Sequence, residues 1–365
     1  MKIVCNREKL LSAFQTAASV APLRSPKPIL RNVKLEVADD KATLIATDLE
    51  IGLRIEVPGI EVEAPGTAVL PIGLFGSILR ESTDEKLRLE SDGRASHVRG
   101  ERSQFKLPSE NPDEFPAVAT FQEGKCHEVP ARLVREIVRR TVFATDSESS
   151  RYALGGVLWE FTADRVTAVA TDGRRLARME GPAQSVGGKA DSAGSTIVPT
   201  RAMQLIERAL SDADAEIQIA VRDNDILLRS PRVTIYSRLV EGRFPRWRDV
   251  FPDRTGTNKI EMVVGPLHAA VRQAMIVTSE ESRGVDFRFG EGSLVLAARA
   301  ADTGESRVEL PISYDGAPVA IMLDPRYVSE FLRVLDSDKN VVMDVKDSEG
   351  AAVLSTDDGY GYVVM

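Results

Sequence analysis

The sequence predicts an α+β protein of three similar domains, each with two helices packed on antiparallel strands. Two repeated patterns support this prediction. Short hydrophobic runs close at Val33, Val157 and Val285, about a third of the chain apart. Prolines that suit the first turn of a helix recur at nearly the same interval, at Pro71, Pro199 and Pro325.

Each repeat shows the same order of elements. In the first repeat, alternating apolar residues predict strands over about 2–5, 33–37, 42–45, 53–57, 87–90 and 103–107. Apolar residues at helical spacing, such as Leu10, Phe14 and Ala18, predict the helices. Over the whole chain we expect them at 6–19, 71–81, 130–141, 199–210, 265–278 and 325–335. In each repeat, the two helices are expected to cover one face of an antiparallel sheet.

Loops rich in proline and glycine separate the repeats, at 108–125 and 241–258. The dipeptides Phe115-Pro116 and Phe244-Pro245 occupy matching places in these two loops. The repeats therefore predict three domains, over 1–122, 123–250 and 251–365.

The composition indicates a globular protein, with 43% hydrophobic and 28% charged residues. No apolar run approaches the roughly 18 residues of a membrane-spanning helix, and the N-terminus turns polar too soon for a signal peptide. Cys5 and Cys126 take equivalent places in the first two repeats. We expect both to be buried thiols, and we expect the protein to be cytoplasmic.

The net charge of −8 argues at first against nucleic-acid binding, but the charge is unevenly distributed. The six expected helices together carry a net charge of +7, so the remainder of the chain carries −15. On any one helix, a few arginines are most often a solvated face. A positive balance on five of six equivalent helices predicts a basic wall suited to an anionic polymer.

Helix packing indicates how such a wall could enclose DNA. Neighbouring helices lie about 8–10 Å apart, so a closed ring of six would leave a hole only about 9 Å wide. Twelve helices would leave about 21–28 Å, which is wide enough for a duplex about 20 Å across. Two chains in head-to-tail contact could therefore encircle DNA, whereas one could not.

A set of short motifs runs through the whole chain in a fixed order. They are Pro28-Ile29-Leu30, Ala46-Thr47-Asp48-Leu49-Glu50, Val169-Ala170-Thr171-Asp172-Gly173-Arg174-Arg175-Leu176-Ala177, Glu241-Gly242-Arg243-Phe244-Pro245, Ser282-Arg283-Gly284-Val285 and Tyr362-Val363-Val364-Met365. Together they resemble the bacterial sliding clamps, the β subunits of DNA polymerase III.

The resemblance implies the DNA-clamp fold in a head-to-tail homodimeric ring, with duplex DNA threaded through the centre independently of its sequence. It implies a processivity factor with no catalytic residues, no cofactor and no metal. The partners it implies are the replicative DNA polymerase subunit, the clamp loader, and other DNA polymerases and repair proteins that carry clamp-binding peptides. It also implies association with the nucleoid.

The resemblance places a partner-peptide pocket in the second and third repeats, as an apolar groove with a cationic rim. Its residues would be Leu154, Thr171, Gly173, Arg174, Arg175, Leu176, Pro245, Val250, Val363 and Met365. The alternatives are an ordinary hairpin turn at Asp172-Gly173 and plain core packing for the apolar members.

The chain departs from the family pattern at two places near this groove. Arg174 stands where many members have histidine. The sequence ends at Met365, where members commonly continue with Pro-Met and a short tail. We therefore expect a shallower groove with a carboxylate beside it.

DNA-binding residues are expected on one loop and on the helices. The resemblance points to Arg24, Arg151, Tyr152 and Arg201, and the charge distribution adds Arg80, Arg135, Arg139 and Arg208. For each helix arginine, the alternative is a solvated surface side chain. For the dimer interface, family position points to Phe105, Leu107, Ile276 and Val277, with core packing as the alternative.

Two other classes of function are less well supported. An enzyme is disfavoured because the three histidines are scattered, and because residues 181–189 lack the spacing of a phosphate-binding loop. The pair Asp357-Asp358 reads as a solvated bend. A non-catalytic repeat scaffold that binds proteins but not DNA fits the composition, and only DNA-binding experiments separate it from a clamp.

Overall fold

The computed structural model describes residues 1–22, 24–146, 152–188, 196–252, 254–280 and 282–365. Contacts between Cα atoms divide the chain into two compact units. Unit 1 comprises residues 1–135, 183–190 and 201–239, and unit 2 comprises residues 136–182, 191–200 and 240–365. Each unit therefore combines segments from more than one of the predicted repeats.

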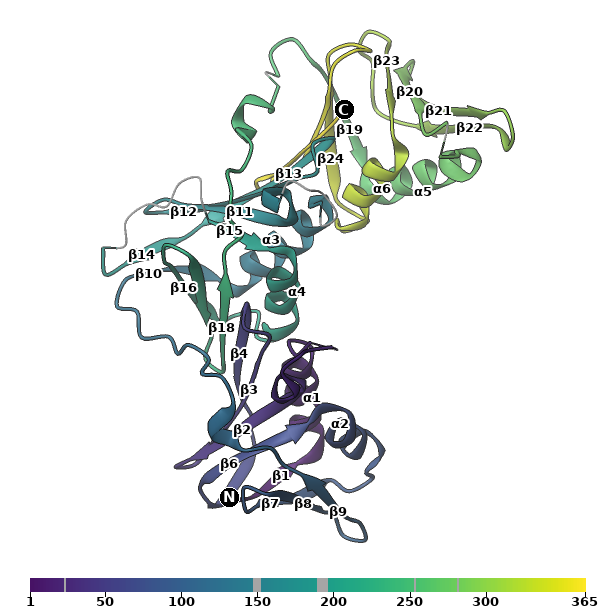
Figure 1. The fold of residues 1–365 in the computed structure, drawn as a ribbon. Coiled ribbons are helices and arrows are strands. Elements are labelled where there is room, and N and C mark those ends of the chain that lie inside the picture. The colour runs from purple at the N-terminus through teal and green to yellow at the C-terminus, as the bar shows by residue number, and fades with distance from the viewer. Residues whose placement is uncertain (23, 147–151, 189–195, 253, 281) are drawn as a thin grey trace. The chain divides into compact units, whose positions relative to one another are not determined.

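Unit 1 contains two antiparallel sheets (Figure 1). The five-stranded sheet has the order β5 (Ile60–Ala64), β1 (Lys2–Asn6), β7 (Lys86–Ser91), β8 (Ala95–Arg99) and β9 (Gln104–Pro108). The nine-stranded sheet has the order β14 (Gln184–Val186), β10 (Cys126–Pro130), β16 (Glu216–Val221), β17 (Asp225–Arg229), β18 (Val233–Arg238), β4 (Ile51–Glu56), β3 (Lys41–Thr47), β2 (Asn32–Ala38) and β6 (Gly66–Pro71).

Unit 2 also contains two antiparallel sheets. The eight-stranded sheet has the order β15 (Ile197–Pro199), β11 (Gly156–Phe161), β12 (Arg165–Thr171), β13 (Arg175–Pro182), β26 (Tyr360–Val364), β25 (Ala352–Ser355), β24 (Asn340–Val345) and β19 (Asn258–Val263). The four-stranded sheet has the order β22 (Gly304–Pro311), β21 (Ser293–Ala300), β20 (Val285–Gly290) and β23 (Val319–Leu323).

The α+β prediction is confirmed, and two of the four sheets extend across the predicted repeats. In the nine-stranded sheet, β4 of the first repeat pairs with β18 of the second, with Ile51 opposite Ser237. In the eight-stranded sheet, β13 of the second repeat pairs with β26 of the third, with Leu176 opposite Val363. Both sheets continue across the repeats because each repeat ends with an unpaired strand edge that its neighbour satisfies.

All six predicted helices are present. They are α1 (Arg7–Ala18), α2 (Ile72–Glu81), α3 (Ala131–Thr141), α4 (Thr200–Ala209), α5 (Val264–Ala274) and α6 (Pro325–Arg333). The expected helix over 265–278 ends early at Ala274 and continues as a 3₁₀ turn, Met275–Val277. Side-chain caps fix the starts of α1 and α6: the side chains of Asn6 and Asp324 accept backbone hydrogen bonds from Lys9 and Arg326.

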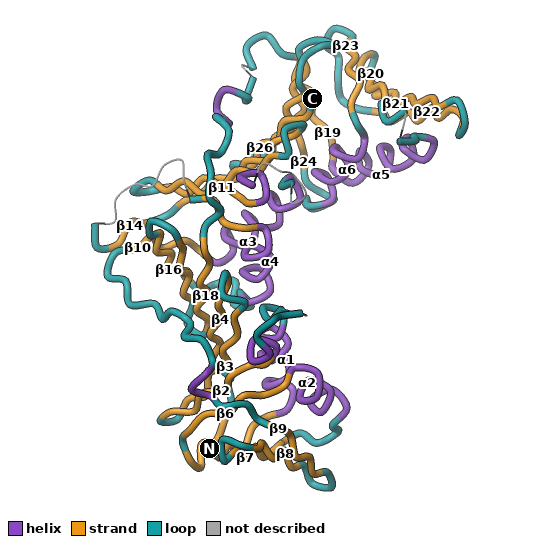
Figure 2. The backbone as a smooth tube through the Cα atoms, viewed as in Figure 1, coloured by secondary structure: helices purple, strands orange, loops and turns teal. Residues whose placement is uncertain are grey.

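Helices pack in pairs against the sheets and bury their apolar faces. In unit 1, α1 contacts α2 and also β3 and β4, and Figure 2 shows these helices on one side of the nine-stranded sheet. The rings of Phe14 and Phe75 meet edge to face at 4.9 Å between the two helices. In unit 2, α5 packs on α6 through buried residues such as Leu267 and Phe331. The core is therefore continuous from the helices to the strands beneath them.

Both cysteines are buried, as expected. None of the described helices is long and apolar enough to cross a membrane.

Candidate partner groove and nucleic-acid surface

The hairpin turn between β12 and β13 is fixed by its own side chains. The Thr171 hydroxyl donates to the carbonyl of Arg175 at 2.6 Å and accepts the N–H of Gly173 at 3.0 Å. One carboxylate oxygen of Asp172 accepts the N–H groups of Arg174 and Arg175 at 2.9 and 3.0 Å. Gly173 has a φ of 87°, in the left-handed region that favours glycine. This turn presents Arg174 to solvent and directs Arg175 inward.

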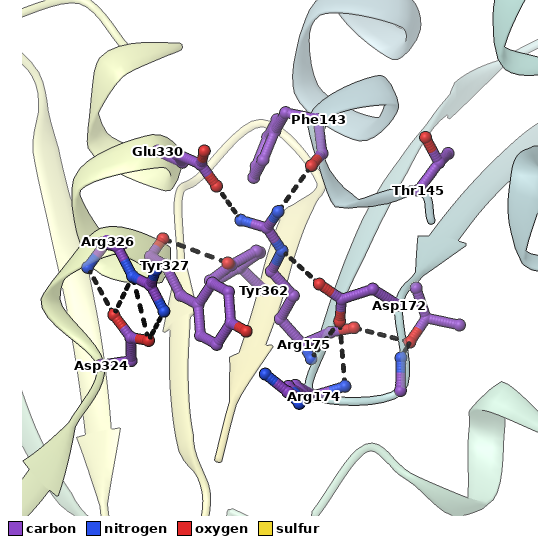
Figure 3. Close-up of polar contacts among 12 residues, drawn as sticks. Phe143, Thr145, Asp172, Arg174, Arg175, Asp324, Arg326, Tyr327, Glu330 and Tyr362 are labelled. Atoms are coloured by element: carbon purple, nitrogen blue, oxygen red, sulfur yellow. Dashed lines mark hydrogen bonds and ion pairs between the residues drawn. The ribbon is translucent and has the colours of Figure 1, made fainter. Parts of the chain in front are cut away.

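Arg175 links this turn to two other segments of unit 2 (Figure 3). Its guanidinium pairs with Asp172 at 3.0 Å and with Glu330 of α6, and it donates to the carbonyl of Phe143 at 2.7 Å. It also lies over the ring of Tyr327, 4.6 Å from the centroid. The side chain is only 8% exposed. Arg175 is thus a buried structural cation, and it does not lie on the expected rim.

Arg174 is the exposed cation of the pair. The Tyr327 hydroxyl raises the pKa of its guanidinium, with a smaller contribution from Asp172. Arg326 lies nearby at the start of α6, where it pairs with Asp324 at 2.6 Å. The expected cationic rim therefore consists of Arg174, with Arg326 beside it.

A buried apolar cluster lies next to the turn. It comprises Leu158, Val169, Leu176, Ile197, Phe244, Trp247, Val353 and Val363. Two of the expected groove residues, Leu176 and Val363, belong to it, and Leu154 and Thr171 are also buried. The groove expected from the sequence did not include Trp247 or Phe244.

The remaining expected groove residues lie at the surface. Val250 and Met365 are exposed apolar side chains, Met365 to 60%, and Pro245 and Gly173 are exposed as well. The backbone N–H of Met365 donates to the carbonyl of Arg174 at 3.3 Å, which places the end of the chain beside the turn. The candidate surface is therefore a buried apolar floor with exposed apolar and cationic residues around it.

The loop over the apolar floor is held by aromatic and charged contacts. Trp247 and Phe251 meet edge to face, and Arg248 lies over the Trp247 ring at 4.3 Å. Arg248 also pairs with Glu160 of β11 at 2.7 Å. Phe251 lies close to Gly361, where an added Cβ would be 3.3 Å from its ring. These contacts fix the aromatic side chains that sequence analysis missed.

The candidate DNA-binding arginines fall into two groups. Arg80, Arg135 and Arg208 are exposed and form no ion pair within the described ranges, and Arg24 is exposed in its loop. Arg139 and Arg201 form ion pairs.

Arg139 lies 3.5 Å from Glu136 and 3.8 Å from Asp336. Arg201 pairs with Asp48 and donates to the carbonyl of Val20 at 2.8 Å. Both cations are partly neutralised by these contacts. Arg151 lies outside the described residues, and Tyr152 begins a short 3₁₀ turn, Tyr152–Gly155.

The candidate interface residues lie at strand edges and at the end of α5. Phe105 is exposed on β9, the edge of the five-stranded sheet, and Leu107 is buried on the same strand. In unit 2, Ile276 is 77% exposed and Val277 is half-buried in the turn after α5. The adjacent β22 is the edge of the four-stranded sheet. Each unit thus presents an unpaired strand edge with an exposed apolar residue close to it in the fold.

Three family profiles cover nearly the whole chain. The N-terminal, central and C-terminal domains of the DNA polymerase III beta subunit match residues 1–119, 128–246 and 248–365. The chain belongs to the DNA polymerase III beta subunit family. The resemblance seen in the sequence is thereby confirmed.

Sliding clamps of other bacteria align with this chain over nearly their full length. The beta sliding clamp of Escherichia coli is 29% identical over 368 residues, covering 100% of this chain and 99% of the relative. That of Chlamydia pneumoniae is 29% identical, with 100% and 98% covered. Among solved structures, the Pseudomonas aeruginosa clamp bound to griselimycin has a TM-score of 0.91 at 28% identity, with 100% and 98% covered.

Membership of the family assigns this clamp the function of a DNA sliding clamp without catalytic activity. Within the described residues, no group of three or more His, Cys, Asp or Glu side chains is arranged to hold a metal ion.

Proposed function

We propose that this clamp encircles duplex DNA as a head-to-tail dimer and tethers a replicative DNA polymerase to it. The observation that carries the proposal is the set of exposed, unpaired arginines on the helices α2, α3 and α4, at Arg80, Arg135 and Arg208. Such cations bind phosphates without reading bases, which is what movement along DNA requires. Arg24 adds a loop contact, and Arg139, Arg151, Tyr152 and Arg201 complete the proposed set.

Partners would dock on the candidate groove of unit 2. A short peptide could place apolar side chains against Val250 and Met365, above the floor that contains Trp247, while Arg174 attracts an acidic residue. The polymerase subunit, the clamp loader, other DNA polymerases and repair proteins are the proposed occupants. The griselimycin complexes of the Pseudomonas aeruginosa and Bartonella birtlesii clamps support this proposal, since they show that relatives bind an added ligand.

The ring would close through the edge strands β9 and β22, with Phe105, Leu107, Ile276 and Val277 in the interface. Strand pairing across two chains satisfies the free backbone groups of both edges. We retain 1–122, 123–250 and 251–365 as the proposed domains, and we place the protein on nucleoid DNA in the cytoplasm.

The test combines the mass of the protein in solution with its retention on circular and linear DNA. We expect the full chain to be a dimer at micromolar concentration and, after loading, to remain on closed circular DNA but to leave linear DNA through its ends. A strictly monomeric chain would overturn the ring. Equal loss from circular and linear DNA would overturn topological binding, and the protein-only scaffold would then replace it.

A further inference from the structure

Unit 1 contains a polar cleft that the groove and the interface do not use. It has a volume of about 330 Å³ and is lined by one face of α1, the end of β4, the last turn of α4 and the turn between β17 and β18. These four segments bring cations together from three directions: Lys9, Arg208 and Arg232.

The three cations have no ion-pair partner among the described residues and are exposed. The cleft also holds two acids, Glu8 and Glu56, but each has a partner of its own. Glu8 pairs with Arg7, and Glu56 pairs with Lys41, both at 3.2 Å. The unpaired charge in the cleft is therefore positive.

Two contacts hold the cations in place. The carbonyl of Arg232 accepts the N–H of Glu56 at 2.8 Å, which ties the turn between β17 and β18 to β4. The side chain of Lys9 lies against Gly59, where an added Cβ would be 3.3 Å from Nζ. Gly59 has a φ of 73°, so the turn that supports Lys9 favours glycine.

A purely structural role does not account for Lys9. It lies in the first turn of α1, where the helix dipole disfavours a positive charge. Like charges without a partner repel one another, and a bound anion would relieve that repulsion. The hydroxyls of Ser12, Thr16 and Ser211 also line the cleft and can donate to anionic oxygens.

We propose that this cleft binds a phosphate group of the DNA backbone, with Lys9, Arg208 and Arg232 as its cationic ligands. Guanidinium groups together with hydroxyls suit phosphate oxygens better than they suit an isolated carboxylate. Arg208 of α4 already belongs to the proposed DNA-binding set, so a backbone phosphate is favoured over a free anion. The inference rests on the proposed function and extends it to Lys9 and Arg232.

The test measures how duplex binding depends on salt. Labelled linear duplex is titrated with the full chain by fluorescence anisotropy over a series of NaCl concentrations. Each lost phosphate contact reduces the slope of log K against log salt by about 0.9. We expect the Lys9→Gln/Arg232→Gln variant to lose about 0.9 from the slope, because the cleft binds one phosphate group.

The matched control is Arg94→Gln/Lys125→Gln, which removes the same charge from exposed, unpaired positions of unit 1 outside the cleft. We expect it to keep the wild-type slope. An equal change in both variants, or no change in either, would overturn the proposal. Competition by inorganic pyrophosphate with unchanged duplex slopes would also overturn it, because the cleft would then hold a free anion.

This result is separable from the proposed function. If the wild type stays on circular DNA and the two double variants have the same slope, only the cleft is refuted. If the wild type shows no topology-dependent retention, the ring fails whatever the slope of the variants.

Discussion

Replacing Arg175 by alanine should destabilise unit 2 by about 3 kcal/mol. Removing one member of a buried ion pair costs about 3–5 kcal/mol, because the remaining charges lose their partner. Asp172 is 16% exposed, so without Arg175 its carboxylate would stay largely desolvated and unpaired, and most of that cost would remain. Glu330 is 37% exposed, so water can solvate its carboxylate once Arg175 is removed. The lost hydrogen bond to Phe143 and the lost stacking on Tyr327 add to the loss, but the rehydration of Glu330 keeps the sum at the low end of that range.

Urea unfolding followed by tryptophan fluorescence tests this prediction, because both tryptophans, Trp159 and Trp247, belong to unit 2. The matched control is Arg174→Ala, one residue away and exposed, which should change stability by no more than about 0.5 kcal/mol. Arg175→Lys should fall between the two, since lysine keeps the charge but lacks the planar fork. If Arg175→Ala unfolds at the same urea concentration as Arg174→Ala, the buried network does not stabilise this unit.

Three further outcomes are expected. Burial raises the pKa of Cys5 to about 12, so iodoacetamide at pH 8 should leave it unlabelled until urea is added; labelling of the native chain would contradict this. Burial opposes ionisation of Asp358, but hydrogen bonds from Thr356 and Arg140 outweigh it and lower the pKa below 3.8. Asp358 therefore stabilises the fold above about pH 4, and this contribution is lost as pH falls through the lowered pKa, so Asp358→Asn should flatten the acid limb of thermal melts. Finally, a partner peptide in the groove should change the emission of Trp247, so Trp247→Phe should abolish that signal and Trp159→Phe should keep it.

The helices could be predicted because their signals are local. Apolar residues at helical spacing and a cap such as Asn6 lie within one segment, and α2 was expected at 71–81 and spans Ile72–Glu81. The sheets could not be predicted in the same way. The pairing of β4 with β18 joins Ile51 to Ser237, 186 positions further along the chain, and no local pattern specifies it.

The residues of the candidate site also differ in how local their sequence signals are. The motif around Thr171 identified the turn and the exposed Arg174, since neighbouring residues make its hydrogen bonds. The burial of Arg175 depends on Glu330, which lies far along the chain. Asp357-Asp358 lies exposed in a turn, as expected. The pairing of Asp358 with Arg140 at 2.7 Å has no local signal, because Arg140 lies far away in the chain. Trp247 could have been identified from the sequence, because Phe244, Trp247 and Phe251 are closely spaced aromatic residues in a loop that is rich in polar residues.

The first two repeats share one turn, which they stabilise in different ways. In both, a threonine hydroxyl bonds back across the turn and an aspartate accepts two backbone N–H groups: Thr47 and Asp48 in unit 1, Thr171 and Asp172 in unit 2. In both, an arginine connects that aspartate to the carbonyl that follows the first helix of the repeat.

The arginines come from different places, and this difference decides what each turn can do. Arg201 reaches the first turn from α4, and the position of Gly173 is taken there by Leu49, which holds a strained φ of 82°. In the second turn, Arg175 comes from the hairpin itself and stacks on Tyr327 of α6. This leaves the adjacent Arg174 exposed. The second turn can therefore offer an exposed cation beside an apolar floor, whereas Glu50 takes the place of Arg174 in the first turn.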